Sequence, residues 1–395
     1  MPIDWMSRAQ AMRDELVARR RDLHRHPELA FEEVRTAGIV AQELGALGLE
    51  VATGVGKTGV VGILDGTRDG PTVMVRCDMD ALPVLEANQA DYISQIPGKM
   101  HACGHDGHTA IGLGLARMFS EQREKLVGRI KFVFQPAEEL ALGAQAMIDD
   151  GVLANPAPDV CLGLHLRNDL PVGEVGLTPG PAMSSADDWR MTIRGAGGHG
   201  ALPEQARDPI VAGAQIVTAL QTIVSRNVSA LDTAVVSVTT FHSGETTNVI
   251  PPEAVLTGTF RAYLPETREL IGRRLREIAT GIAAALQCKA DIEFFQLTPP
   301  LFNDPAVVNR LLEAFRQVDT PRSLQWLDHV RWMAAEDMAL FLQKVPGVYM
   351  FVGSADKARQ LDYPHHHPRF DFDEDALPIG AGLLATAIAA YVLPG

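Results

Sequence analysis

Residues 72–80 have the sequence TVMVRCDMD, a short apolar run, rich in β-branched residues, that ends in two aspartates. An apolar run of this length predicts a buried strand. Two similar runs follow, RIKFVF at 129–134 and DVCLGLH at 159–165, and a helical stretch at 109–126 lies before them. Strands that alternate with helices predict an α/β layer with a mostly parallel sheet.

The pattern changes near residue 186. The expected elements from there are strand 189–194, helix 209–224, strands 233–241 and 254–263, helix 266–286 and strand 289–296. This β-α-β-β-α-β order is typical of a small α+β sandwich. We therefore expect a discontinuous α/β domain over 1–185 and 298–395, with a second domain inserted at 186–297.

Composition excludes several classes of protein. The chain has 395 residues, 46% of them hydrophobic, and a formal net charge of −14. This charge argues against a nucleic-acid binder and against docking on an anionic membrane. Four dispersed cysteines are too few for a disulfide framework, and no apolar signal segment is visible, so we expect a cytoplasmic protein with reduced thiols.

The uncharged segment 376–395 is the one membrane candidate in the sequence. Pro378 and Pro394 bracket it and leave a helix of about 14 residues, shorter than the ~20 that a span requires. A buried terminal helix is therefore the better interpretation.

The segment GVGKTG at 54–59 matches a dinucleotide-binding pattern. That pattern needs a strand before it and a helix after it. Here an apolar strand-like run follows, so we expect a tight loop between strands instead.

Histidine, cysteine and acidic residues cluster where the expected strands end. HACGHDGH at 101–108 contains three His, one Cys and one Asp, and thiolate and imidazole suit Zn, Mn, Co or Ni. Not all five residues need to bind metal. His108 could equally be a residue that supports the ligands or one that begins a helix. A solvated His-rich loop is the alternative.

Further candidates follow the next strands. Glu138 and Glu139 come directly after FQPA, and adjacent glutamates can divide the work, one as a metal ligand and one as general base for a water that the metal activates. The alternative is a pair of acids at a helix start. His165 closes an apolar strand and could instead be a core histidine.

Two more segments belong to this set. Asp78-Met79-Asp80 is a weak signal alone, with a turn pair as the alternative. The tandem histidines of HHHPRFD at 365–371 form either metal ligands or an exposed loop. Together, a Cys, several His and a Glu at sheet-end loops fit one metal centre with about five ligands, and a dinuclear centre of this kind catalyses hydrolysis.

These motifs together resemble the M20 metallopeptidase family, in particular its amidohydrolase branch, which hydrolyses N-acyl amino acids, hippurate and auxin conjugates. The matching segments are RRDLHRHPELAFEE, GKMHACGHDGHTA, FQPAEE, GLH, GGHGALP, NVIP, GTFR and HHPRFDFDEDALPIG. They occur in order over residues 20–380. The resemblance implies an α/β metallohydrolase domain with an inserted lid or dimerisation domain.

By motif position, the resemblance implies five metal ligands: Cys103, His105, Glu139, His165 and His366. Because the branch has His, one residue, then Pro, Pro368 selects His366, and His367 takes a place that is usually small and polar. Glu138 corresponds to the general base, and Asp80 to an acid that orients a ligand. The roles of Asp78, Asp106, His108 and His367 stay open.

The inserted domain contributes three implied residues. His199 matches a histidine that reaches the partner subunit's site and stabilises an oxyanion, and a plain turn residue is the alternative. Asn248 and Arg261 match residues that hold the substrate's carboxylate. Arg261 could instead be an exposed strand charge.

The implied activity is metal-dependent hydrolysis of the amide bond of N-acyl amino acids, with two divalent ions (Mn, Zn, Co or Ni) in each subunit of a homodimer or larger homo-oligomer. Two alternatives stay open: a dipeptidase, carboxypeptidase or N-carbamoyl hydrolase, and a non-catalytic metal-binding or ligand-binding dimer. The segment Leu140–Gly143 and the late motif Glu336-Asp337-Met338 depart from the branch and bear on the acyl pocket.

Overall fold

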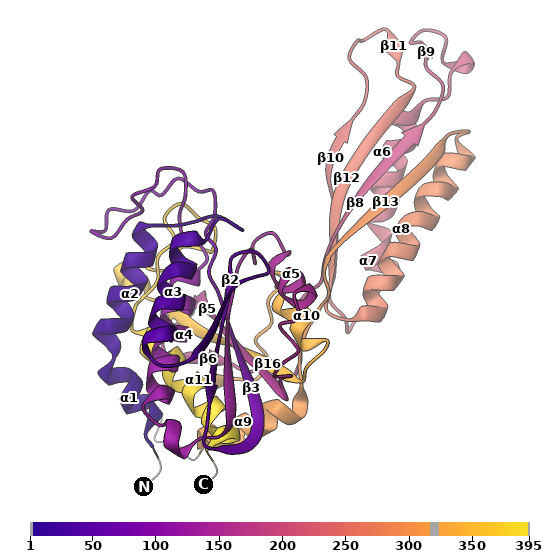
Figure 1. Ribbon diagram of the computed structural model, residues 1–395. Helices are drawn as coiled ribbons and strands as arrows, with labels where there is room; N and C mark the ends of the chain where they lie inside the picture. The colour runs from indigo at the N-terminus through magenta and orange to yellow at the C-terminus, as the bar shows by residue number, and fades with distance from the viewer. Residues whose placement is uncertain (1–2, 317–323, 394–395) are drawn as a thin grey trace. The chain divides into compact units, whose positions relative to one another are not determined.

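The chain folds into two units, which we describe separately (Figure 1). The computed structural model describes residues 3–316 and 324–393. The first unit comprises Met1–Ala182, Phe302–Arg331 and Asp337–Gly395, and the second comprises Met183–Leu301 with Trp332–Glu336.

An eight-stranded mixed sheet forms the centre of the first unit, in the order β1-β2-β4-β3-β5-β16-β6-β15. Its strands are β1 (Glu50–Val55), β2 (Gly59–Asp65), β3 (Arg68–Asp78), β4 (Val127–Gln135), β5 (Val160–Pro171), β6 (Glu174–Gly176), β15 (Gln325–Leu327) and β16 (Gly347–Ala355). The central strands β4, β3, β5 and β16 are parallel, while β1, β2 and β4 pair antiparallel. The expected α/β class is confirmed, and the GVGKTG segment turns between paired strands β1 and β2, as expected.

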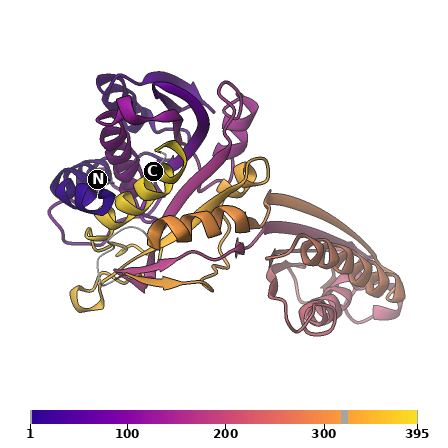
Figure 2. The same cartoon turned by 90° about the horizontal axis from the view of Figure 1, so that it is seen from below.

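Helices cover this sheet. They are α1 (Trp5–Ala11), α2 (Arg13–Arg25), α3 (Val34–Ala46), α4 (His105–Ser120), α5 (Gly143–Asp149), α9 (Pro305–Arg316), α10 (Met338–Leu342) and α11 (Ala376–Val392). α4 and α11 pack on β3 and β5, α2 packs on α4, and α1 packs on α11. Figure 2 shows the last pair, with the N-terminal helix in indigo beside the C-terminal helix in yellow.

Alternate side chains of β3 point to opposite faces of the sheet, and the two faces differ in character. Val73, Val75 and Cys77 belong to the apolar core under the helices. Arg76 and Asp78, on the alternate side, are fully buried and paired with each other. Since successive strand residues point to opposite faces, one strand both fills the core and carries charge to the sheet's other face.

The C-terminal helix differs from the expectation at its start. α11 begins at Ala376 and has 17 residues, rather than about 14 bounded by Pro378. Pro378 lies in the first helical turn, where the backbone N–H has no intrahelical partner and proline is tolerated. The helix is almost entirely buried. None of the helices among the described residues has both the length and the apolar character to cross a bilayer. Pro394 lies outside the described residues.

The second unit has the predicted β-α-β-β-α-β order. Its main elements are β8 (Ala186–Arg194), α6 (Pro209–Leu220), α7 (Thr222–Arg226), β10 (Ala234–His242), β12 (Glu253–Ala262), α8 (Pro265–Ala285) and β13 (Lys289–Thr298). The antiparallel sheet has the order β10-β12-β8-β13, with α6 and α8 packed on it. A small ribbon pairs β9 (Gly198–His199) with β11 (Val249–Ile250). A second short pair joins β7 (Gly180–Met183) and β14 (Leu301–Asn303).

Candidate metal centre

The candidate site lies at the carboxyl ends of the central parallel strands. β3 ends at Asp78, and β4 ends at Gln135, just before the two glutamates. Gly104 adopts a left-handed conformation (φ +97°) directly before α4, so that Cys103 precedes the turn and His105 begins the helix. Glycine adopts this conformation without strain, which explains the glycine between the two candidate ligands.

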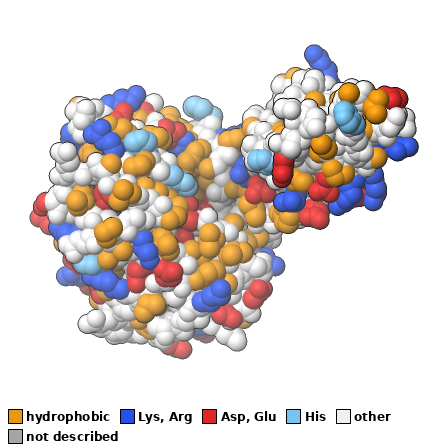
Figure 3. Space-filling model, turned by 90° about the horizontal axis from the view of Figure 1, so that it is seen from above, with side chains coloured by type: hydrophobic (Ala, Val, Ile, Leu, Met, Phe, Trp, Pro, Cys, Tyr) orange, Lys and Arg blue, Asp and Glu red, His pale blue; other side chains and the backbone are white. Residues whose placement is uncertain are grey.

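Four of the five predicted ligands gather around one sulfur atom. Cys103 Sγ lies 3.6 Å from His165 Nε2, and the ligand atoms of Cys103, His105 and Glu139 all lie within 4.8 Å of one another. The fifth, His366, is placed beside them, with its Nε2 3.3 Å from Glu139 Oε2. Figure 3 shows histidine side chains, in pale blue, at the surface of the first unit.

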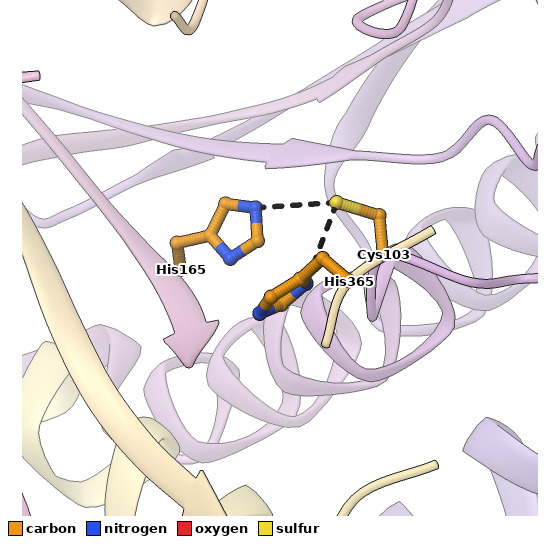
Figure 4. A group of neighbouring side chains, drawn as sticks. All are labelled: Cys103, His165 and His365. Carbon is orange, nitrogen blue, oxygen red and sulfur yellow. Dashed lines mark hydrogen bonds between the residues drawn. The ribbon is translucent and has the colours of Figure 1, made fainter. Parts of the chain in front are cut away.

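A sixth side chain, which the sequence analysis did not select as a ligand, also reaches the sulfur. His365 Nδ1 lies 3.7 Å from Cys103 Sγ, and its ring lies beside that of His165, with ring centroids 5.2 Å apart (Figure 4). The run of three histidines was the signal for this residue, but only one position of the run was selected. The third, His367, stacks on Tyr363 instead, with ring centroids 4.9 Å apart.

Hydrogen-bond partners assign the proton on two ligand histidines. His105 Nδ1 contacts the carbonyl oxygen of Asp80 at 2.9 Å, and His165 Nδ1 contacts the carbonyl oxygen of Leu166 at 2.7 Å. A carbonyl only accepts, so each Nδ1 carries a hydrogen and each Nε2 is the ring atom left to face a metal. This is the arrangement of a metal-binding histidine held from behind.

Two buried atoms at the centre have charged groups nearby but no hydrogen bond within the described part of the chain. His105 Nε2 and Glu139 Oε1 are buried and make no hydrogen bond with any described residue. Buried polar atoms without hydrogen bonds are unfavourable in a folded protein unless an ion or water fills the space between them. Together with the thiol and the imidazoles, they fit a divalent transition metal.

The electrostatics of the site also favour a cation. Burial raises the pKa of the Cys103 thiol well above its usual range, and Glu139 and Glu138 raise it further. Burial by itself lowers the pKa of His105, but the nearby carboxylates, Asp78 first, raise it to about 10. A bound cation would offset this excess of negative charge, and it would favour the thiolate.

His108 lies beside the centre, and both of its ring nitrogens are hydrogen-bonded to other groups. Its Nδ1 donates to Asp78 Oδ1 at 2.6 Å, and its Nε2 accepts from the backbone N–H of Leu166 at 3.0 Å. Both ring nitrogens are therefore engaged, which excludes His108 as a ligand in this arrangement. Asp78 is also held by Arg76 Nη1 at 2.5 Å. Although burial opposes it, the charges of His105 and Arg76 and the hydrogen bond from His108 hold the pKa of Asp78 well below its usual range.

The loop with the two glutamates is fixed from two sides. Asp80 Oδ2 accepts the backbone N–H of Glu139 at 3.0 Å, and Glu33 Oε1 accepts that of Ala137 at 2.9 Å. Ala137 has a positive φ of 52°, a conformation that a non-glycine residue keeps only when its surroundings impose it. Glu33 was not selected from the sequence, although it closes the matching segment at 20–33.

A buried charge network joins α2 to the start of α4 and to the loop that follows the histidine run. Arg20, fully buried, donates to Asp106 Oδ2 at 2.9 Å and to Asp371 Oδ1 at 2.7 Å. Asp106 lies next to His105, and Asp371 follows the histidine run. His24 Nδ1 also contacts Asp106 Oδ2 at 2.8 Å. Asp106 therefore anchors the start of α4 behind the ligands, and its partners among the described residues give it no place among the ligands.

The predicted residues of the second unit fall into two groups. His199 and Asn248 are exposed neighbours: the β9–β11 ribbon pairs His199 with Val249, and Gly200 N–H donates to Asn248 O at 2.8 Å. Arg261 lies near the far end of β12, eight residues beyond its start, which is roughly 26 Å along a strand at ~3.3 Å per residue. Its Nη1 is buried and makes no hydrogen bond with any described residue.

Fold and centre together define a metal-dependent hydrolase, in which an α/β unit collects Cys, His and Glu ligands at its strand ends. The chain belongs to the peptidase family M20/M25/M40, whose family model matches residues 74–390.

Three known proteins illustrate this kinship. The chain is 38% identical to an N-acetylcysteine deacetylase of Bacillus subtilis over 97% of this chain and 98% of that protein. It is 39% identical to the IAA-amino acid hydrolase ILR1-like 5 of Arabidopsis thaliana over 96% of this chain and 87% of that protein. The crystal structure of the Bacillus subtilis YxeP protein, described as a dinuclear metal-binding peptidase of the M20 family, has a TM-score of 0.84 at 35% identity and covers 96% of this chain and 98% of that one.

Proposed function

We propose that this hydrolase cleaves the amide bond of N-acyl amino acids. Two divalent ions, Mn, Zn, Co or Ni, would be held by Cys103, His105, Glu139, His165 and His366. The observation that carries this proposal is the convergence of a thiol, imidazoles and a carboxylate on one centre, with a second glutamate directly beside it. The names of the deacetylase and the auxin-conjugate hydrolase both describe acylated amino acids.

The bound metal would supply a Lewis acid for the amide carbonyl and lower the pKa of a water molecule. We assign to Glu138 the role of accepting a proton from the attacking water, and its contact with the ligand cluster supports this, since its Oε2 lies 3.9 Å from His105 Nε2. The same carboxyl group would then give the proton to the leaving amine. Asp80 holds the neighbouring Glu139 and His105 in place during this transfer.

The second unit would bind the rest of the substrate. We assign oxyanion stabilisation to His199 and recognition of the substrate's carboxylate to Arg261, whose fork pairs a carboxylate with two hydrogen bonds. Asn248 lies before the start of β12 and Arg261 lies near its far end, so we infer that the two meet on one carboxylate only if Asn248 comes from another subunit. We therefore propose a dimer in which His199 and Asn248 act in the partner's site, and a cytoplasmic setting for it.

The test is a substrate panel with a catalytic knock-out. Protein reconstituted with Mn, Zn, Co or Ni would be assayed with N-acetyl, N-benzoyl and indoleacetyl amino acids, dipeptides and N-carbamoyl amino acids. We expect metal-dependent release of amino acid from the N-acyl substrates. Glu138→Gln should lower kcat by about 10²–10⁴-fold while keeping the metal. Glu124→Gln, at an exposed glutamate, is the matched control.

Two outcomes would contradict the proposal. Hydrolysis of only the dipeptides or only the carbamoyl substrates would move the activity to another branch of the family. Full turnover by Glu138→Gln would remove Glu138 as the base.

A further inference from the structure

We propose that His365 is a positioning residue that donates its Nδ1–H to the sulfur of Cys103, rather than a metal ligand. Cys103 contacts two histidine rings at nearly the same distance, His165 Nε2 at 3.6 Å and His365 Nδ1 at 3.7 Å (Figure 4). The proposal rests on the function proposed above, in which the Cys103 thiolate binds metal.

The tautomer of His365 follows from its second contact. Its Nε2 accepts a hydrogen bond from the backbone N–H of Asn168 at 3.3 Å. A backbone amide only donates, so Nε2 carries no hydrogen and the single ring proton lies on Nδ1. That N–H faces the sulfur.

His165 has the opposite arrangement. Its Nδ1–H is donated to the carbonyl oxygen of Leu166, and its lone pair on Nε2 faces the same sulfur. Thus one ring offers a ligand atom and the other offers a donor. Binding of metal at His365 Nδ1 would move the proton to Nε2, where it would confront the Asn168 N–H.

The ring of His365 is held in this orientation by packing. It lies edge-on to His165, with ring centroids 5.2 Å apart, and against Phe370 at 4.9 Å. Its neighbour His366 is exposed and lies beside Glu139 instead. Consecutive residues therefore serve different atoms of the same centre.

We expect this hydrogen bond to fix the orientation of the Cys103 thiolate and to reduce the electron density on its sulfur. Cys103 belongs to two groups of possible ligand atoms, one with His165 and His365 and one with His105 and Glu139, so the direction of its sulfur affects the whole centre. A hydrogen bond to a ligating sulfur holds the sulfur in one orientation and withdraws electron density from it. Loss of such an outer partner lowers metal affinity by about 10–100-fold.

The test uses the full-length protein loaded with Co²⁺ alone, because thiolate binding to Co²⁺ gives a charge-transfer band in the near ultraviolet. His365→Leu removes the donor and keeps an apolar ring-sized group. We expect the band to move to longer wavelength and Co²⁺ affinity to fall by about 10–100-fold. His365→Asn, whose side-chain N–H can take the place of Nδ1–H, should restore both toward wild type. His367→Leu, two residues away and stacked on Tyr363, should change neither.

The outcomes separate this inference from the function on which it rests. If the wild-type band survives Cys103→Ser, the ligand set of the proposed function is wrong. If that band vanishes in Cys103→Ser but His365→Leu keeps wild-type wavelength and affinity, the role of His365 is wrong and the function stands. A loss of one bound Co²⁺ per subunit in His365→Leu, without rescue by His365→Asn, would make His365 a ligand and overturn the inference.

Discussion

The carboxylate of Asp80 accepts a hydrogen bond from the backbone N–H of Glu139, with Oδ2 3.0 Å from the nitrogen. The backbone carbonyl of the same aspartate accepts the Nδ1–H of His105 at 2.9 Å. Asp80 therefore connects two candidate ligands from different segments, one at the start of α4 and one in the loop after β4. It does so from behind the centre, with an exposed fraction of 1%.

Asp80→Ala should release the Glu139 loop and weaken metal binding by about 10–100-fold. Asp80→Asn should have a smaller effect, because the amide oxygen can still accept the Glu139 N–H. Titration calorimetry of the metal-free protein with Mn²⁺ or Co²⁺ measures both. Asp69→Ala, at an exposed position of β3, is the control, and equal affinities for all variants would contradict the orienting role.

Glu33→Ala should lower kcat by about ten- to a hundredfold, since the N–H of Ala137 loses its acceptor next to the proposed base Glu138. KM should change less than kcat, because Glu33 does not belong to the proposed substrate contacts. The adjacent Glu32→Ala, which loses only a surface ion pair with Lys99, should keep the wild-type rate. A similar loss in both variants would show that the effect is not specific to the loop.

Arg20→Met should destabilise the protein by about 3–5 kcal/mol, because Asp106 and Asp371 would keep buried charges without their cation. Arg13→Met is the matched control, since its partner Asp375 is exposed and such pairs contribute at most about 1 kcal/mol. Urea unfolding of the metal-free proteins measures the free energies. Equal values for the two variants would contradict the assignment of Arg20 as an anchor.

Lys131 makes the free energy of unfolding depend on pH. Burial lowers its pKa from 10.5 to about 8, while its Nζ donates to the carbonyls of Ala154 and Pro156. Between these two pH values the unfolded chain binds more protons than the folded protein, so stability rises with pH. Wild type should therefore gain stability over Lys131→Met between pH 8 and pH 10. Unfolding of both proteins in urea at the two pH values tests this, and a constant difference would contradict it.

Much of the fold followed from local patterns. Apolar runs predicted β3, β4 and β5, and the order of elements in the second unit was predicted correctly because each strand and helix carries its own periodicity. The start of α11 was predicted wrongly. Pro378 does not bound the helix, because a proline in the first turn of a helix removes no hydrogen bond.

The supporting residues of the site were not predictable in the same way. Glu33 acts on a backbone amide 104 residues away, and Arg20 pairs with Asp371 across 351 residues. Neither residue differs in local sequence from an ordinary surface charge. Their roles exist only because the sheet brings distant loops to one end.

The sequence alone determined which chemical groups are present: a thiol, imidazoles and paired glutamates. Because these groups follow strands of a parallel sheet, the sequence also predicted that they lie at one edge of it. Tertiary structure decided how each group is used. His108, His165 and His365 are the same residue type, yet one has both nitrogens engaged, one presents a lone pair and one presents an N–H. The reason is physical, because a histidine's tautomer is set by the backbone group that its other nitrogen meets, and that partner comes from elsewhere in the fold.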